Sequence, residues 1–199
     1  MLVGKRMTPN PVTVAPQETL ASAQAKMQAG KFRRLPVVKD GELVGIASDR
    51  DMRAHLGHEE RTKITAAMSE DLVTVTPSTT IESAAQLMLK RKIGGLPVVE
   101  DGKLVGIITT SDILSAFLEV MGATEEGVAR VDLVLKGAPH DLGDAAKAIA
   151  AIGSEILSVG TYREKWDENR VFYMLMRTKD VEHVAEVLKS KGFTVLGTH

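Results

Sequence analysis

The stretch LPVVKDGELVGIASDRD, residues 35–51, is followed by a second version of itself, LPVVEDGKLVGIITTSD, at residues 96–112. With an offset of 61 positions, residues 7–52 align without a gap on residues 68–113, and 21 of the 46 pairs are identical. Similarity over this length indicates a duplicated structural unit. The two copies therefore predict one fold that occurs twice.

Each copy is expected to fold as β-α-β-β-α. Short runs of β-branched residues, 12–14 and 73–75, lead through a proline to a helix with apolar residues at helical spacing. Thr19 and Thr80 are the predicted N-caps of these helices. Two apolar strands then flank an Asp-Gly pair, which is typical of a tight hairpin turn. About 50 residues bury too little surface to be stable alone, so the copies are expected to pack around a pseudo-twofold cleft.

The second helix of each copy begins where the strand reaches a hydroxyl residue, Ser48 or Thr109, with an aspartate three positions later, Asp51 or Asp112. A hydroxyl at the N-cap with an acidic residue at N3 is the pattern of a capping box. The same helix start offers amides that favour phosphate oxygens, and a carboxylate can accept from ribose hydroxyls. From the spacing alone, both interpretations stay open.

The remaining segment, residues 127–199, has a different pattern. Alternating apolar residues predict strands, and helical spacing predicts two helices between them. The order β-α-β-β-α-β is that of the ferredoxin-like fold. Leu135 is expected on the inner face of the first strand, and Trp166 at a hairpin turn, where it either packs across the hairpin or marks a partner-binding patch. The strands are expected at 128–135, 154–162, 170–178 and 193–196, and the helices at 141–153 and 180–192.

The duplicated segments closely resemble a tandem of CBS domains, the Bateman module, on the order and spacing of MT…VTV.P..T, LPVV.DG.LVGI and the hydroxyl–aspartate pair. The resemblance implies an α/β (α+β) protein with CBS repeats at residues 1–60 and 61–122. Residues 123–126 are expected to form a linker to the last domain, 127–199.

The last domain resembles an ACT domain. Of that family's D-x-P-G-x-L loop, Pro139 and Leu142 are kept, but His140 stands where the glycine belongs. Because glycine allows a close approach of the backbone to a ligand, this change favours a dimer-forming role over amino-acid binding. The whole architecture resembles the acetoin-utilisation B family and related CBS–ACT regulators.

The CBS resemblance implies a regulatory sensor of an adenosyl ligand (AMP, ADP, ATP, NAD or S-adenosylmethionine) and not an enzyme. Arg34 precedes the Leu-Pro of the first copy where the second has Gly95, so the two sites are expected to differ, with Arg34 supporting the more phosphate-selective one. The expected contacts are Asp51 and Asp112 with the ribose, Ser48, Thr109, Ser111 and Arg34 with phosphate, and Val14, Thr76, Val37 and Val98 with adenine.

The composition narrows the remaining possibilities. Lys plus Arg (25) balances Asp plus Glu (26), which disfavours a nucleic-acid partner. Cysteine is absent, which excludes disulfides and thiolate chemistry and fits a reducing cytoplasm. No apolar run approaches the ~18 residues of a membrane helix, so no membrane association is expected. No catalytic or metal-ligating constellation is evident.

The expected partners are a second copy of the chain, in a homodimer, and a regulated enzyme. The family resemblance suggests that this enzyme acts in acetoin or central carbon metabolism. The alternative interpretation is an amino-acid-sensing ACT regulator in which the CBS pair serves as a dimerisation scaffold.

Overall fold

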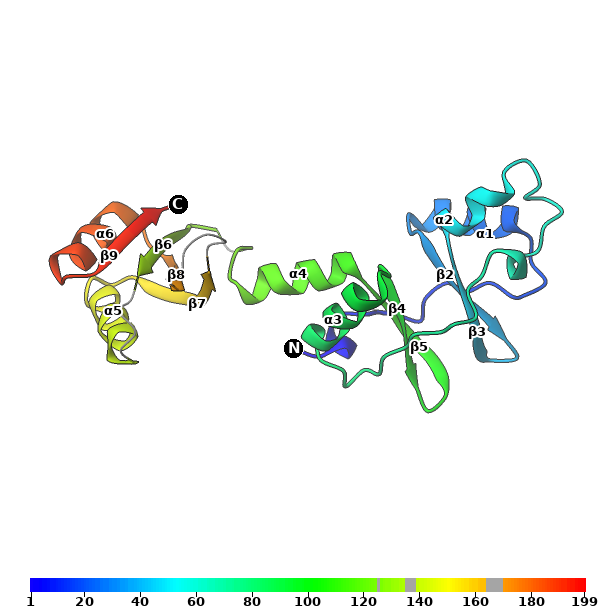
Figure 1. Cartoon of the computed structure of the whole chain (residues 1–199), viewed down its shortest axis with the longest axis horizontal. Coiled ribbons are helices and arrows are strands. Elements are labelled where there is room, and N and C mark those ends of the chain that lie inside the picture. The colour runs from blue at the N-terminus through cyan, green and yellow to red at the C-terminus, as the bar shows by residue number, and fades with distance from the viewer. Residues whose placement is uncertain (125, 135–138, 164–169) are drawn as a thin grey trace. The chain divides into compact units, whose positions relative to one another are not determined.

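The computed structural model describes residues 1–124, 126–134, 139–163 and 170–199. The chain divides into two compact units, residues 1–116 and 117–199, each with its own sheet (Figure 1). The expected positions of Leu135 and Trp166 lie outside the described residues.

The first unit contains two hairpins, each with a helix before it and a helix after it (Figure 1). Corresponding elements begin 61 positions apart, as the internal repeat predicts. The first repeat comprises α1 (Leu20–Gly30), β2 (Arg34–Lys39), β3 (Glu42–Ser48) and α2 (Asp49–Met52). The second comprises α3 (Ile81–Arg91), β4 (Gly95–Glu100), β5 (Lys103–Thr109) and α4 (Thr110–Val120). A strand β1 (Thr8–Pro9) and the 3-10 turns Val3–Lys5, Arg53–His55 and Ile64–Ala66 complete it.

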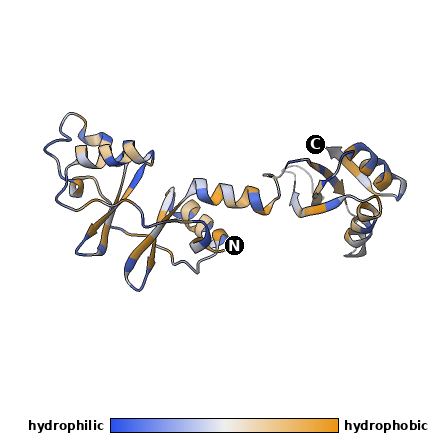
Figure 2. Cartoon of the chain, turned by 180° about the vertical axis from the view of Figure 1, so that it is seen from behind, coloured by the Kyte–Doolittle hydropathy of each residue, from blue (hydrophilic) through white to orange (hydrophobic). Residues whose placement is uncertain are grey.

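The local signals for these elements are confirmed. The Thr19 side chain accepts a hydrogen bond from the Ser22 amide (3.2 Å), and that of Thr80 accepts one from the Ser83 amide (3.1 Å). In both hairpins the Asp-Gly pair has positive φ at both residues, for example 51° and 86° in the first, as a type I′ turn requires. Figure 2 shows the tips of both hairpins as hydrophilic.

The two short strands expected at 12–14 and 73–75 are single bridges, Val14–Val37 and Val75–Val98. The Val14 amide donates to the Pro36 carbonyl (3.1 Å) and its carbonyl accepts from the Val38 amide (2.9 Å). The preceding carbonyl, that of Thr13, accepts from the Lys26 ammonium (3.1 Å) instead of from a strand. The prediction of strands three residues long was therefore wrong in extent.

The two repeats exchange their first turns. Val3 lies in the core of the second repeat and Ile64 in the core of the first, and both side chains are fully buried. The Val3 amide donates to the Thr79 carbonyl (2.8 Å), and the Ile64 amide donates to the Glu18 carbonyl (2.9 Å). A division of the chain between residues 60 and 61 therefore does not separate the two cores, because each core contains a residue from the other repeat.

The same exchange continues at the sheet. Strand β1 pairs with β5, with Thr8 opposite Ile107, and the equivalent residue Ser69 bridges to Ile46. Beside these contacts Met7 packs over Gly106. These reciprocal pairs, each 61 positions from its counterpart, are the contacts expected of a pseudo-twofold pair.

A charged cluster fixes the turn before α1. The Glu18 carboxylate accepts from the Lys26 ammonium (2.8 Å), the Ala15 amide (2.9 Å) and the Ser22 hydroxyl (2.7 Å). Burial alone would raise the pKa of Glu18, but these hydrogen bonds outweigh it and lower the pKa to about 2. Thr79, the equivalent residue, accepts from the Thr76 amide (3.0 Å) instead, so this ion pair belongs to one repeat.

Glu18→Gln is expected to lower the free energy of unfolding at neutral pH by about 1–3 kcal/mol. Since the folded pKa lies below the unfolded value of 4.5, the carboxylate stabilises the fold above pH 4.5 and loses this effect as the pH falls towards 2. Urea unfolding of wild type and variant between pH 3 and 7 should show the difference shrinking with acid. The exposed Glu60→Gln serves as control, and a constant difference over this range would contradict the prediction.

The second unit confirms the predicted element order. It consists of β6 (Val128–Val134), α5 (Pro139–Ala151), β7 (Glu155–Arg163), β8 (Arg170–Arg177), α6 (Val181–Ser190) and β9 (Thr194–Thr198). The sheet is antiparallel in the order β7-β8-β6-β9, the ferredoxin-like arrangement. Both helices pack on one face, where Leu133, Met174, Ile149 and Leu188 are fully buried. His140 lies in the first turn of α5.

The other face of this sheet holds a buried carboxylate. Asp132 is 5% exposed and accepts from the Arg130 Nε (2.6 Å) and Nη2 (3.0 Å) and from the Tyr162 hydroxyl (3.0 Å). The Arg130 guanidinium also lies over the ring of Tyr173, 4.7 Å from its centroid. This network satisfies the charge that the strand buries.

Candidate functional site

The first unit contains two cavities that are related by the internal repeat. The Asp112 cavity has a volume of about 440 Å³, and the Asp51 cavity about 360 Å³. Each is built by the first residues of one repeat, the end of that repeat's first helix, and the strand-to-helix junction of the other repeat. The Asp112 cavity is lined by residues 8, 10–12, 30–34, 107 and 109–112, and the Asp51 cavity by 34, 46–48, 50, 51, 69, 71, 73, 91–95 and 97.

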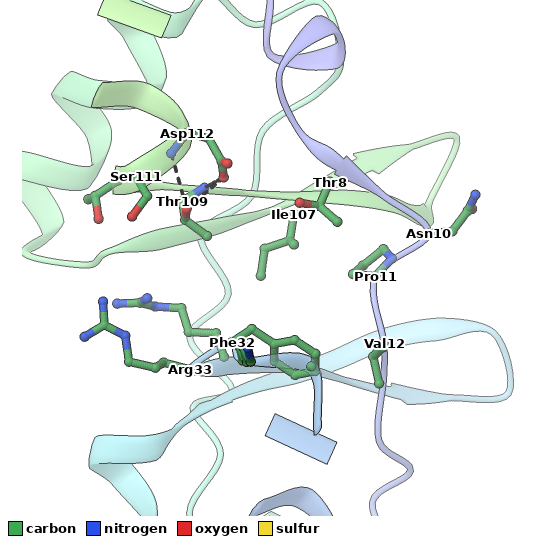
Figure 3. Close-up of a pocket in the computed structure, with 14 residues that line it drawn as sticks. Thr8, Asn10, Pro11, Val12, Phe32, Arg33, Ile107, Thr109, Ser111 and Asp112 are labelled. Carbon is green, nitrogen blue, oxygen red and sulfur yellow. Dashed lines mark hydrogen bonds between the residues drawn. The ribbon is translucent and has the colours of Figure 1, made fainter. Parts of the chain in front are cut away.

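The Asp112 cavity has an apolar and a polar part (Figure 3). Ile107 and Phe32 face each other across it, close to Val12. Thr109 and Ser111 lie on the side from which Arg33 approaches. A ligand with a flat apolar group at one end and an anionic group at the other would match both parts.

Both aspartates close capping boxes. Oδ2 of Asp112 accepts from the amide (2.7 Å) and hydroxyl (2.7 Å) of Thr109, and Oδ2 of Asp51 accepts from the amide (2.9 Å) and hydroxyl (2.6 Å) of Ser48. Among the described residues, no group donates to Oδ1 of either aspartate. Capping therefore uses one carboxylate oxygen and leaves the other available to a ligand, so the two interpretations of this motif are compatible.

Cations outnumber carboxylates in both walls. Three cations accompany one carboxylate in the Asp112 cavity, and four accompany two in the Asp51 cavity. This excess favours an anionic ligand. The groups are Lys31, Arg33, Arg34 and Asp112 in the former, and Arg34, Arg50, Arg91, Lys92, Asp51 and Asp71 in the latter.

Arg34 is the charged residue that both cavities share. Burial lowers the pKa of its guanidinium, and the neighbouring charge of Arg33 lowers it further, while Asp49 and Asp51 act in the opposite direction. A partly buried cation of this kind gains from a nearby anion, because part of its hydration is already lost.

The structure brings together most of the residues expected at a site. Thr109, Ser111, Asp112 and Arg34 line one cavity, and Ser48, Asp51 and Arg34 line the other. Arg34 was expected to serve a single site.

The four residues expected near adenine lie elsewhere. Val14, Val37 and Val98 are at most 1% exposed and belong to the two cores. Thr76 is exposed and hydrogen-bonds to Thr79. None of the four lines either cavity. In a continuous strand, Val12 and Val14 would share a face, because side chains two positions apart point the same way. This segment pairs with β2 only at Val14, so Val14 lies in the core while Val12 lines the cavity.

From the sequence, no ligand-binding role was predicted for the residues at the end of each first helix. Lys31 and Lys92 end α1 and α3 in the left-handed conformation, with φ of 54° and 55°. Phe32 and Arg33 follow the former, and both enter the Asp112 cavity wall. A signal was present at one position, since Lys31 and Lys92 are identical when the two copies are aligned.

The described part of the chain has neither a metal-binding cluster nor a membrane-spanning helix. Among the described residues, no three His, Cys, Asp or Glu side chains lie in a group that could hold a metal ion. The helices of the described part are all too short or too polar to cross a bilayer.

The comparison with known proteins agrees with the duplicated fold. The pattern of the CBS domain matches residues 3–58 and residues 63–119. The chain belongs to the CBS-domain family. The tandem expected from the sequence is thereby confirmed, and the family match ends before the second unit's sheet.

Two curated relatives illustrate the range of CBS proteins. The CBS domain-containing protein YhcV of Bacillus subtilis is 34% identical over 110 residues, which are 54% of this chain and 79% of YhcV. An inosine-5'-monophosphate dehydrogenase of Staphylococcus aureus is 31% identical over 156 residues, 76% of this chain. The match covers 32% of the dehydrogenase, so it concerns a part of that enzyme.

Solved CBS pairs share the fold. An acetoin utilization protein (AcuB) from Vibrio cholerae is 35% identical with a TM-score of 0.56, covering 63% of this chain and 98% of its own. The CBS pair of MJ0100, in complex with 5'-methylthioadenosine and S-adenosyl-L-methionine, is 28% identical with a TM-score of 0.56 and the same coverage. CBSX2 in complex with AMP is 30% identical with a TM-score of 0.54, covering 60% and 97%.

Proposed function

We propose that the chain is a non-catalytic regulatory sensor that binds an adenosyl ligand in the cavities of its CBS pair. The observation that carries this proposal is the pair of aspartates whose Oδ1 accepts no hydrogen bond from the described residues, each facing an excess of cations. AMP, ADP, ATP, NAD and S-adenosylmethionine all combine a flat base with a ribose and a charged group. The complexes of CBSX2 with AMP and of MJ0100 with S-adenosyl-L-methionine support this class.

Each part of such a ligand has a suitable counterpart in the Asp112 cavity. The base would lie among Val12, Phe32 and Ile107, because an apolar slot stabilises a flat aromatic ring (Figure 3). The ribose hydroxyls would donate to the free oxygen of Asp112. Phosphate would lie at Arg33, whose fork of N–H groups fits phosphate oxygens.

The regulatory step would follow from the interlocked fold. Each cavity contains residues of both repeats, so a ligand that binds one arrangement of the repeats more tightly shifts the population towards it. The second unit, which we take as an ACT-like domain, or a regulated enzyme would respond to that shift. We also propose a homodimer in the cytoplasm, and the likeness to AcuB supports a place in acetoin or central carbon metabolism.

Thermal unfolding with a panel of ligands tests the proposal. At a free concentration a hundred times its Kd, an adenosyl ligand should stabilise the fold by about 2.7 kcal/mol. The panel comprises AMP, ADP, ATP, NAD, S-adenosylmethionine and the twenty amino acids. Stabilisation by an amino acid and by no adenosyl compound would overturn the proposal and favour the ACT-like domain as sensor.

A further inference from the structure

Arg34 breaks the symmetry of the two repeats at the point where they meet. It lies opposite Ser48 in the first hairpin, and its equivalent, Gly95, lies opposite Thr109 in the second. The preceding pair is also unequal, since Arg33 corresponds to Gly94. One repeat thus supplies two guanidinium groups where the other supplies no side chain.

The Arg34 side chain occupies the space that these glycines leave. A Cβ atom placed on Gly95 would lie 2.9 Å from the Arg34 Cδ and 3.3 Å from its Nε. A Cβ atom on Gly94 would lie 3.0 Å from the Arg34 Cζ. The Arg34 side chain therefore extends from its own repeat across the second repeat. It fits there because Gly94 and Gly95 have no side chains.

This path brings Arg34 to both cavities. It is the one residue common to the two cavity walls. Within the part of the chain that the structure describes, its guanidinium makes no hydrogen bond and no ion pair shorter than 4 Å. A partly buried guanidinium without a fixed counter-ion can turn to an anion on either side.

We propose that Arg34 is a single anion-binding group shared by the two cavities, so that one ligand phosphate engages it at a time. This proposal rests on the proposed function and adds a coupling to it. The first phosphate-bearing ligand would bind with the help of Arg34, and the second would bind more weakly without it. Adenosine, which has no phosphate, would bind the two cavities independently.

The test uses the full chain with one cavity disabled at a time. Asp51→Asn leaves the Asp112 cavity intact, and Asp112→Asn leaves the Asp51 cavity intact. Arg34→Ala is then added to each background, and the affinities for AMP and adenosine are measured by calorimetry. A shared group predicts that Arg34→Ala weakens AMP binding about tenfold in both backgrounds and leaves adenosine binding within about twofold.

Arg33→Ala is the matched control, because Arg33 lines the Asp112 cavity and not the Asp51 cavity. It should weaken AMP binding in the Asp51→Asn background and not in the other. A loss caused by Arg34→Ala in one background only, or in neither, overturns the sharing while the proposed function stands. A background that binds adenosine but no AMP also overturns it. Failure of the whole ligand panel with the wild-type chain overturns both.

Discussion

The combined variant Asp51→Asn and Asp112→Asn is expected to bind AMP about 10- to 100-fold more weakly than the wild type at each of its two cavities. Each carboxylate uses Oδ2 for its capping box, with no donor to Oδ1 among the described residues. Asparagine keeps an oxygen for the cap but replaces the second oxygen by a donor group. A hydrogen bond to a charged group contributes about 1.5–3 kcal/mol, which is roughly 10- to 100-fold in affinity for each contact.

The free energy of unfolding distinguishes the loss of a ligand contact from damage to the N-termini of the two helices. The double variant should lose no more than about 1 kcal/mol of unfolding free energy at each site, since the caps are kept. Thr80→Ala is the matched control, because Thr80 caps α3 and lines neither cavity. It should cost about 1 kcal/mol and leave the AMP affinity within twofold. Calorimetry and urea unfolding measure the two quantities, and wild-type AMP binding by the double variant would contradict the role of the carboxylates.

Ile64→Ala is expected to lower the free energy of unfolding by about 2–5 kcal/mol. Ile64 belongs to the second repeat in sequence, but its side chain is fully buried in the core of the first repeat beside Leu20 and Met52. Truncation removes apolar contacts and leaves a cavity in a closely packed core. Urea unfolding measures the loss.

The neighbouring Thr65 provides the control for Ile64, since it is exposed. Thr65→Ala should change the unfolding free energy by no more than about 0.5 kcal/mol. Val3→Ala, at the equivalent position of the other core, should be destabilising as well, by an amount typical of a smaller side chain. If Ile64→Ala behaved like Thr65→Ala, the exchange of first turns between the repeats would be refuted.

The local part of this fold is predictable from sequence. The Asp-Gly pairs, the threonine caps and the β-α-β-β-α-β order of residues 127–199 all depend on neighbours in the chain, and the structure agrees with each. The 61-residue repeat further predicted that two copies of one β-α-β-β-α unit pack together. Signals of this kind act within a few residues, so one sequence suffices to find them.

The contacts between the repeats were beyond these signals. Nothing near Val3 or Ile64 in sequence says that each enters the other repeat's core. The cavities depend on the same exchange, because the aspartate of one repeat faces the basic residues of the other. For this reason the motif Ser48–Asp51 was found, whereas its partners Arg91 and Lys92 were not.

The apolar part of the site shows a similar limit. Val14 and Val37 have the residue type that an adenine slot needs, but they lie in a core. Val12 is 49% exposed and lines the cavity two positions earlier. The residue type does not distinguish Val12 from Val14, because both are valines. Their positions differ because only Val14 forms the bridge to β2.

A crystal structure of the full chain grown with AMP would show whether the Asp112 cavity holds the ligand. We expect electron density for AMP in the Asp112 cavity, with the ribose on Oδ1 of Asp112 and the phosphate towards Arg33 and Arg34. AMP bound outside both cavities, in a protein that AMP stabilises against heat, would contradict it.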